Sequence, residues 1–291
     1  MLSIQDLSKT YPNGVRALRG VTLEIPRGMF GLLGPNGAGK STLMRTIATL
    51  QEADAGSIRF GELDVLQQKE EVRKVLGYLP QEFGVYPRIS AGAMLDHFAV
   101  LKGITQAKER REIVDHLLQM TNLYSKRKLN LSTFSGGMRQ RFGIAQALLG
   151  DPQLIIVDEP TAGLDPEERN RFLNLLSEIG ENVVVILSTH IVEDVSDLCQ
   201  RMAILAQGQV QLTGAPSTII DKLAGKIWRK VIEKGELASY QEELTVISTR
   251  WYAGRLEIHV FSDEALDDGF EQVPPDLKDA YFSTLNLAEA A

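Results

Sequence analysis

The chain has 291 residues, 44% of them hydrophobic and 24% charged, which is an ordinary composition for a globular protein. Its formal net charge of −7 and its lack of clustered Lys and Arg argue against a nucleic-acid-binding surface, so no nucleic-acid partner is expected. The single cysteine, Cys199, excludes an intrachain disulfide, and the longest apolar runs are far shorter than the ~20 residues of a membrane-spanning helix.

The first 81 residues carry mostly strand patterns, interrupted by one glycine-rich loop. A turn is expected at residues 12–14, where Pro, Asn and Gly follow one another. The glycine-rich loop leads into a segment of helical character, Ser41–Leu50. Alternating residues or short apolar runs predict strands at Leu2–Leu7, Arg16–Ile25, Met29–Leu33, Ser57–Phe60 and Val75–Leu79.

From about residue 90 the apolar spacing changes to i, i+3, i+4, which is typical of helices. Helices are predicted at Ala93–Leu101, Arg110–Met120 and Arg139–Leu149. Leu154–Val157 is then fully apolar, as in the centre of a parallel sheet. Helix and strand alternate beyond it, in the order Pro166–Ile179, Val183–Ser188, Ile191–Leu198 and Arg201–Leu205. This alternation predicts an α/β fold with a helical insertion at about residues 82–150.

A change of pattern after Gly214-Ala215-Pro216 indicates a domain boundary. Beyond it, the strand-like segments Glu243–Trp251 and Arg255–Phe261 flank Ala253-Gly254 and predict a hairpin, and Asp276–Leu285 predicts a closing helix. We therefore predict two units, residues 1–215 and a small α+β domain at 216–291. Residues 1–215 are expected to fold and bind nucleotide without the second unit.

One motif predicts phosphate binding. Residues 34–41 match G-x-x-x-x-G-K-[ST], in which glycines let backbone N–H groups curve around phosphates and the following helix directs its positive end toward them. Lys40 would place a cation on the β and γ oxygens, and the Ser41 hydroxyl would hold Mg²⁺. The predicted phosphate-binding residues are Gly34, Pro35, Asn36, Gly37, Ala38, Gly39, Lys40, Ser41 and Thr42.

Further short elements surround this motif in a fixed order. They are Tyr11, Gln81 after a strand, Ser135-Gly136-Gly137 before a helix, Asp158-Glu159 at the end of the apolar strand, Gly163-Leu164-Asp165, and His190. Together with the phosphate-binding motif they resemble the ATP-binding cassette (ABC) transporter ATPases, over roughly residues 1–215. The resemblance implies a P-loop NTPase core with an antiparallel β subdomain and a helical insertion, and it implies Mg-dependent ATP hydrolysis.

The resemblance also assigns roles to single residues. Tyr11 stands where the family stacks an aromatic ring on adenine. Gln81 matches the Q-loop residue that senses Mg²⁺ and the attacking water. Asp158 matches the residue that holds Mg²⁺ through water, and Glu159 the general base. His190 matches the switch histidine, which contacts the γ-phosphate and fixes the geometry of the water.

Ser135, Gly136 and Gly137 match the family's signature motif, which binds the γ-phosphate held by the other subunit. With one cassette in the chain, a homodimer on ATP binding is implied, and Asp165 matches the D-loop. The resemblance further implies a separate transmembrane permease subunit, which would hold this cytoplasmic chain at the inner face of the cell membrane. Phe134 and Met138 depart from the usual Leu and Gln, and the Met form resembles the exporter branch.

Two questions stay open at this point, and three histidines receive no functional role. The alternative function is an ABC ATPase acting on ribosomes or nucleic acid, although one cassette without a coiled coil favours a transporter. Segment Phe83–Ile89 is interpreted either as an apolar docking surface for the permease or as a buried connection. His97, His116 and His259 lack partners at ligand spacing and are expected at ordinary core or surface positions.

Overall fold

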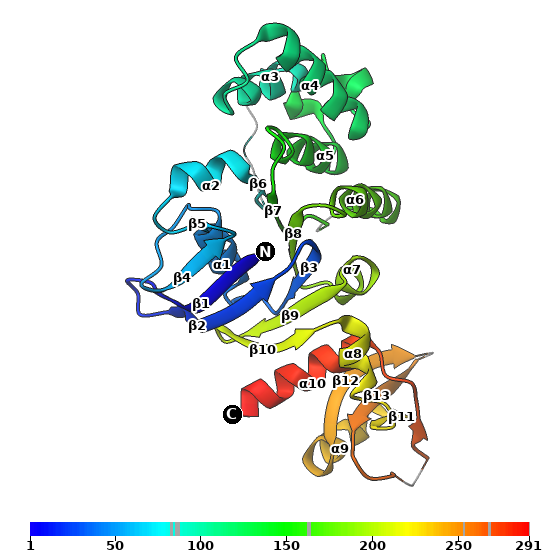
Figure 1. Ribbon diagram of the computed structural model, residues 1–291. Helices are drawn as coiled ribbons and strands as arrows, with labels where there is room; N and C mark the ends of the chain where they lie inside the picture. The colour runs from blue at the N-terminus through cyan, green and yellow to red at the C-terminus, as the bar shows by residue number, and fades with distance from the viewer. Residues whose placement is uncertain (82–83, 85–87, 162–163, 253, 267–268, 291) are drawn as a thin grey trace.

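The computed structural model describes residues 1–81, 84, 88–161, 164–252, 254–266 and 269–290. Within these residues the strands form three sheets, two in the first part of the chain and one in the last (Figure 1). None of the described helices has both the length and the apolar character that a membrane crossing needs.

The first sheet is antiparallel, in the order β2-β1-β4-β5. Its alternating pattern directs Leu2 and Ile4 toward the core, where they stand opposite Ile25 and Leu23. Burying one face of such a sheet is what its period-two pattern requires. Its strands are β1 (Leu2–Thr10), β2 (Arg16–Ile25), β4 (Ala55–Phe60) and β5 (Leu63–Asp64).

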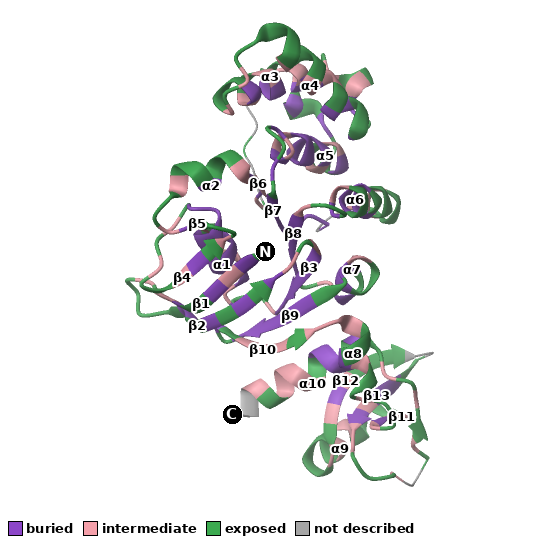
Figure 2. Cartoon of the chain, in the orientation of Figure 1, coloured by how far each residue is buried: buried purple, intermediate pink, exposed green. Residues whose placement is uncertain are grey.

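The second sheet has the order β10-β9-β3-β8-β7-β6, parallel except for β10. Its central strands are buried along their whole length (Figure 2), because layers of other structure cover both faces. The register pairs Leu33 with Thr189 and Asp158 with Ser188, so three strands end together at one edge. The strands are β3 (Gly28–Leu33), β6 (Leu76–Leu79), β7 (Leu154–Asp158), β8 (Val184–Thr189), β9 (Arg201–Ala206) and β10 (Gln209–Gly214).

Helices cover this sheet and build the insertion. Helices α3, α4 and α5 surround a separate apolar cluster, which includes Leu95, Leu118 and Phe142. The predicted antiparallel subdomain, parallel core and helical insertion are therefore all present. The helices are α1 (Lys40–Ile47), α2 (Lys69–Val75), α3 (Ala91–Leu101), α4 (Ala107–Met120), α5 (Gly136–Ala147), α6 (Pro166–Ile179) and α7 (Val192–Leu198).

The last part of the chain contains the third sheet, which is antiparallel with the order β12-β13-β11-β14. The predicted hairpin is β12–β13, and Ile232 of β11 with Leu256, Ile258 and Val260 of β13 forms the small core of the sheet. The elements are α8 (Pro216–Asp221), β11 (Ile227–Ile232), α9 (Leu237–Glu243), β12 (Thr245–Tyr252), β13 (Arg255–Phe261), β14 (Glu271–Gln272) and α10 (Leu277–Ala290).

Helices α8 and α10 pack back on the first part of the chain. Ile219, Leu277, Ala280 and Tyr281 belong to the apolar cluster that also holds residues of β3, β8 and β9. Figure 1 shows α10 running beside β9 and β10 while the third sheet lies beyond it. The domain boundary between residues 215 and 216 stays a prediction. The segment that follows this boundary contributes side chains to the apolar core of the first part of the chain.

Candidate functional site

The phosphate-binding motif forms the loop between β3 and α1, and two of its glycines have no substitute. Gly39 caps α1 with a φ of 106°, and a Cβ added there would lie 2.3 Å from the Ala17 carbonyl oxygen. A Cβ at Gly34 would lie 2.2 Å from the Leu205 carbonyl oxygen. Backbone crowding on both sides therefore fixes the loop that presents its N–H groups at the start of α1.

Lys40 is buried at the base of this loop, with 5% of its surface exposed. Its ammonium group donates to the carbonyl oxygens of Gly34 at 2.7 Å and Pro35 at 3.2 Å. The same nitrogen lies 3.4 Å from Oε1 of Glu159. A buried charge needs such partners, and here the partners come from both the loop and the end of β7.

Glu159 connects the loop to the end of β8. It follows β7 with a φ of 50°, unusual for a residue other than glycine, and its N–H donates to the Ser188 carbonyl at 2.8 Å. Its second oxygen, Oε2, lies 2.6 Å from Nδ1 of His190. One carboxylate thus contacts a buried ammonium and a half-exposed imidazole, which is a geometry suited to moving a proton.

Asp158, Ser41 and Gln81 present the oxygen ligands that the resemblance assigns to Mg²⁺. Burial raises the pKa of the Asp158 carboxyl, while the hydroxyls of Ser188 and Ser41 act in the opposite direction. Among the described residues, none gives its buried Oδ1 a hydrogen bond. A carboxylate, a hydroxyl and an amide are hard donors, so this set fits Mg²⁺ held mainly with phosphate oxygens.

Most of these groups line a cavity of about 340 Å³, although Asp158 and Gly34 are not among the residues that line it. The Tyr11 hydroxyl at its rim contacts Oγ1 of Thr42 at 3.2 Å and donates to Oε1 of Gln51 at 2.9 Å. The cavity brings together predicted residues from five segments. It is lined by Tyr11, Val15, Ala17, Pro35, Asn36, Gly37, Ala38, Gly39, Lys40, Ser41, Thr42, Gln81, Glu159 and His190.

Sequence reasoning missed Val15 and Ala17. The predicted turn after Tyr11 could have indicated them. The Tyr11 N–H donates to the Val15 carbonyl at 2.9 Å, so the turn brings Val15 back next to Tyr11. Val15 and Ala17 both line the cavity together with Tyr11.

The signature residues lie apart from this cavity, and none of the described residues lining it comes from 135–137 or from 165. Ser135 caps α5 by accepting the Met138 N–H at 3.2 Å, and Ser135 and Gly136 are exposed. Asp165 caps α6 by accepting the Glu168 N–H at 2.9 Å. Gly163 of the predicted D-loop and residues 83 and 85–87 of the predicted docking segment lie outside the described residues.

Sequence reasoning also missed a buried network behind the site. Asp194, fully buried in α7, accepts from the Thr161 hydroxyl at 2.5 Å and from Nε of Arg169 at 2.8 Å. These contacts join the segment after Glu159 to α6 and α7.

Comparisons with known proteins agree with this geometry. Residues 18–162 match the family model described as ABC transporter. The linearmycin resistance ATP-binding protein LnrL of Bacillus subtilis is 34% identical over 77% of this chain and 72% of its own. The methionine import ATP-binding protein MetN of Bordetella pertussis is 34% identical over 83% of this chain and 69% of its own.

Among solved structures, the dimeric ATP-binding cassette MJ0796 bound to ADP and phosphate superposes with a TM-score of 0.68. It is 27% identical to this chain and aligns with 74% of it and 98% of MJ0796. The chain therefore belongs to the ABC transporter ATP-binding proteins. It is an ATPase and an ATP-binding subunit of a transporter, and the ribosome or nucleic-acid alternative is not favoured.

Proposed function

We propose that this chain hydrolyses Mg-ATP in the cavity at the carboxyl ends of β3, β7 and β8, with Glu159 as general base. The observation that carries the proposal is the placement of Glu159 between Lys40, 3.4 Å away, and His190, 2.6 Å away. A carboxylate in this position can accept a proton from water while neighbouring groups fix the direction of attack.

Each remaining group has one task. Lys40 and the loop N–H groups bind the β and γ phosphates, and the Tyr11 ring stacks on the adenine. His190 holds the attacking water against the γ-phosphate, because its imidazole is fixed by Glu159 on one side and reaches the cavity on the other. Ser41, Asp158 and Gln81 would hold Mg²⁺, which neutralises phosphate charge when bound.

We infer a homodimer that forms on ATP binding. Ser135 and Gly136 are exposed at the start of the twelve-residue helix α5, where N–H groups and the helix dipole favour a phosphate. These residues do not line the cavity of their own chain. A second copy, facing the first, would complete each site with its signature residues and bring Asp165 to the interface.

A transmembrane permease is the proposed membrane partner, which would hold the chain at the inner face of the membrane. A groove of about 610 Å³ between β6, which leads to Gln81, and the end of α3 supports this proposal. Leu101 in that groove is 70% exposed, and such apolar exposure is typical of docking surfaces.

The docking groove can be tested with Leu101→Asp. We expect the isolated subunit to keep its ATPase activity within about threefold, a free-energy change under ~1 kcal/mol, and to co-purify less with the permease. Met120→Asp, at a residue 42% exposed on α4, is the control. Normal co-purification of Leu101→Asp would place the docking surface elsewhere.

The hydrolytic site is tested with Glu159→Gln. The amide keeps the size of the side chain but cannot accept the proton, so we expect ATP to bind normally and hydrolysis to slow by at least about tenfold. Size-exclusion chromatography with ATP should then show an accumulated dimer. Glu181→Gln, at an exposed position, serves as the control. A fully active, strictly monomeric Glu159→Gln variant would refute the proposed site.

A further inference from the structure

The first turns of α10 contact three different parts of the molecule within four residues. Lys278 reaches the first turn of α7, Asp279 reaches the third sheet, and Tyr281 reaches the cavity beside His190. Nothing in the motifs of an ATP site requires a helix that lies more than eighty residues beyond His190. Two of these contacts connect α10 to the segment 190–193, which carries His190.

Lys278 forms an ion pair with Glu193, three residues after His190. Its ammonium lies 2.5 Å from Oε1 of Glu193, and this hydrogen bond lowers the pKa of the Glu193 carboxyl. Both side chains are about half exposed, so the pair contributes little to stability. The pair does connect α10 directly to the helix that follows His190.

Tyr281 lies next to the same segment and packs in the apolar cluster that includes Val192. Its ring is buried, with 6% exposed, and lines with His190, Ile191 and Val192 a cavity of about 420 Å³. Burial raises the pKa of the Tyr281 hydroxyl, and the negative charge of Glu159 adds to the effect. The ring thus lies in the wall of a cavity that His190 also lines, and it packs in the same apolar cluster as Val192.

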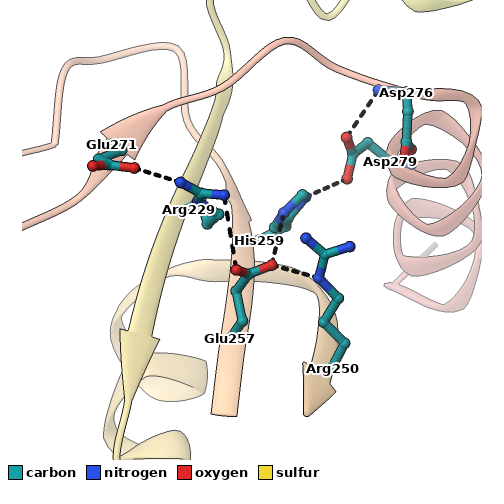
Figure 3. Close-up of polar contacts among 7 residues, drawn as sticks. All are labelled: Arg229, Arg250, Glu257, His259, Glu271, Asp276 and Asp279. Carbon is teal, nitrogen blue, oxygen red and sulfur yellow. Dashed lines mark hydrogen bonds and ion pairs between the residues drawn. The ribbon is translucent and has the colours of Figure 1, made fainter. Parts of the chain in front are cut away.

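Asp279 fixes this helix end to the third sheet (Figure 3). Its Oδ1 lies 2.7 Å from Nδ1 of His259, and Asp276 and Asp279 each accept the other's backbone N–H. His259 in turn lies 3.7 Å from Glu257, which is 2% exposed and bonded to Arg250 at 2.5 Å. These contacts connect the start of α10 to the third sheet.

We propose that Lys278 and Tyr281 are positioning residues that hold the segment 190–193, so that the rate of hydrolysis depends on the C-terminal sheet and α10. The proposal rests on the proposed role of His190 in hydrolysis. Because neither side chain lines the ATP cavity, their loss should lower kcat and leave the KM for ATP unchanged.

A double-mutant cycle in the full-length chain tests the ion pair. We expect Lys278→Met and Glu193→Gln each to lower kcat about fivefold with KM unchanged, and the double variant to be no slower than either. The control is the exposed pair Lys226–Asp263 at 2.7 Å, where Lys226→Met and Asp263→Asn should leave kcat within about twofold. Tyr281→Ala should also lower kcat, and Tyr281→Phe, which keeps the ring, should restore it.

The outcomes separate this proposal from the one on which it rests. If Glu159→Gln, assayed in parallel, keeps full activity, the proposed ATP site fails and this inference with it. If Glu159→Gln is slow but the Lys278 and Glu193 variants keep the wild-type kcat, only the positioning role is refuted. The positioning role would also be refuted if the losses of kcat in the two single variants add up in the double variant, or if the variants change only the KM for ATP. If these variants lower the melting temperature but keep the wild-type kcat, α10 stabilises the fold and does not position the segment 190–193.

Discussion

At the scale of single residues, Glu159 takes a conformation that its neighbours enforce. A φ of 50° is uncommon for a glutamate, and its backbone is held by a 2.8 Å bond to the Ser188 carbonyl. The turn directs the carboxylate back toward Lys40 instead of along the strand. The contacts of the carboxylate to Lys40 and His190 offset the strain of this backbone conformation, and they connect three strand ends.

Lys40→Ala should fail at an earlier step than Glu159→Gln. Removing the ammonium deletes the cation on the phosphates and leaves the buried Glu159 carboxylate without its 3.4 Å partner. We expect ATP affinity to fall by more than about tenfold, or ~1.4 kcal/mol. Nucleotide titration measures this, and equal binding by the wild type and the variant would contradict the assignment of the phosphate loop.

Cys199 gives a probe of native packing. Burial raises the pKa of its thiol to about 12, so the group stays protonated and unreactive near neutral pH. We expect iodoacetamide to label the folded chain at pH 8 at least about a hundredfold more slowly than the chain in denaturant. Because this is the single cysteine, mass spectrometry reads the result directly. Rapid labelling of the folded chain would show that α7 opens easily.

At the scale of elements, the start of α1 depends on Gly39. A side chain there would combine a φ of 106° with a clash against the Ala17 carbonyl, and both the loop and β2 would have to shift. We therefore expect Gly39→Ala to abolish ATP binding, measured by titration, and to lower the melting temperature. Gly235→Ala, where an added Cβ meets nothing within 4 Å, should change neither. Normal ATP affinity in Gly39→Ala would refute the proposed cradle.

Sequence patterns predicted best those elements in which the spacing of the apolar residues shows which side is buried. Strand β2 begins and ends where its alternation predicted, and the apolar run of β7 is fully buried inside the parallel sheet, between β8 and the edge strand β6. Helix α5 begins at Gly136 instead of Arg139, because the Ser135 cap outweighs the low helix propensity of two glycines. The short helix α2 was missed, since Val72 is its one buried residue and leaves no periodic pattern.

The candidate site was predictable to the extent that its chemistry lies in contiguous motifs. Glu159 and His190 were identified from short segments, and the parallel sheet brings those segments to one edge. Tyr281 could not be identified in this way, because its place in the cavity that His190 also lines follows from how α10 packs and not from neighbouring residues. Tertiary contacts between distant segments leave no local signal.

At the scale of the whole molecule, the C-terminal part is built into the ATP-binding part. Its sheet has a core of its own, but α8 and α10 bury Ile219, Leu277 and Tyr281 in the cluster that lies on the parallel sheet. Gln207 also donates to the Ala288 carbonyl at 3.0 Å, which holds the far end of α10 near the phosphate loop. Such contacts let the two parts influence each other's geometry.

Truncation after residue 215 tests how far the first part is independent. All residues assigned to the nucleotide lie before residue 191, so we expect the chain 1–215 to bind Mg-ATP. It should also melt several degrees lower, because losing a buried Leu or Tyr contact costs about 1.5–3 kcal/mol. Differential scanning calorimetry and nucleotide titration give the two measurements.

Leu277→Ser in the full-length chain is the matched control for this truncation. It perturbs the packing of α10 but keeps the third sheet, so it should reproduce part of the lower melting temperature while ATP affinity stays normal. If both chains melt like the wild type, the contacts of α8 and α10 contribute nothing measurable to stability. A folded chain 1–215 that cannot bind ATP would instead show that residues 216–291 form part of the nucleotide site, and the boundary at 215 would then be wrong.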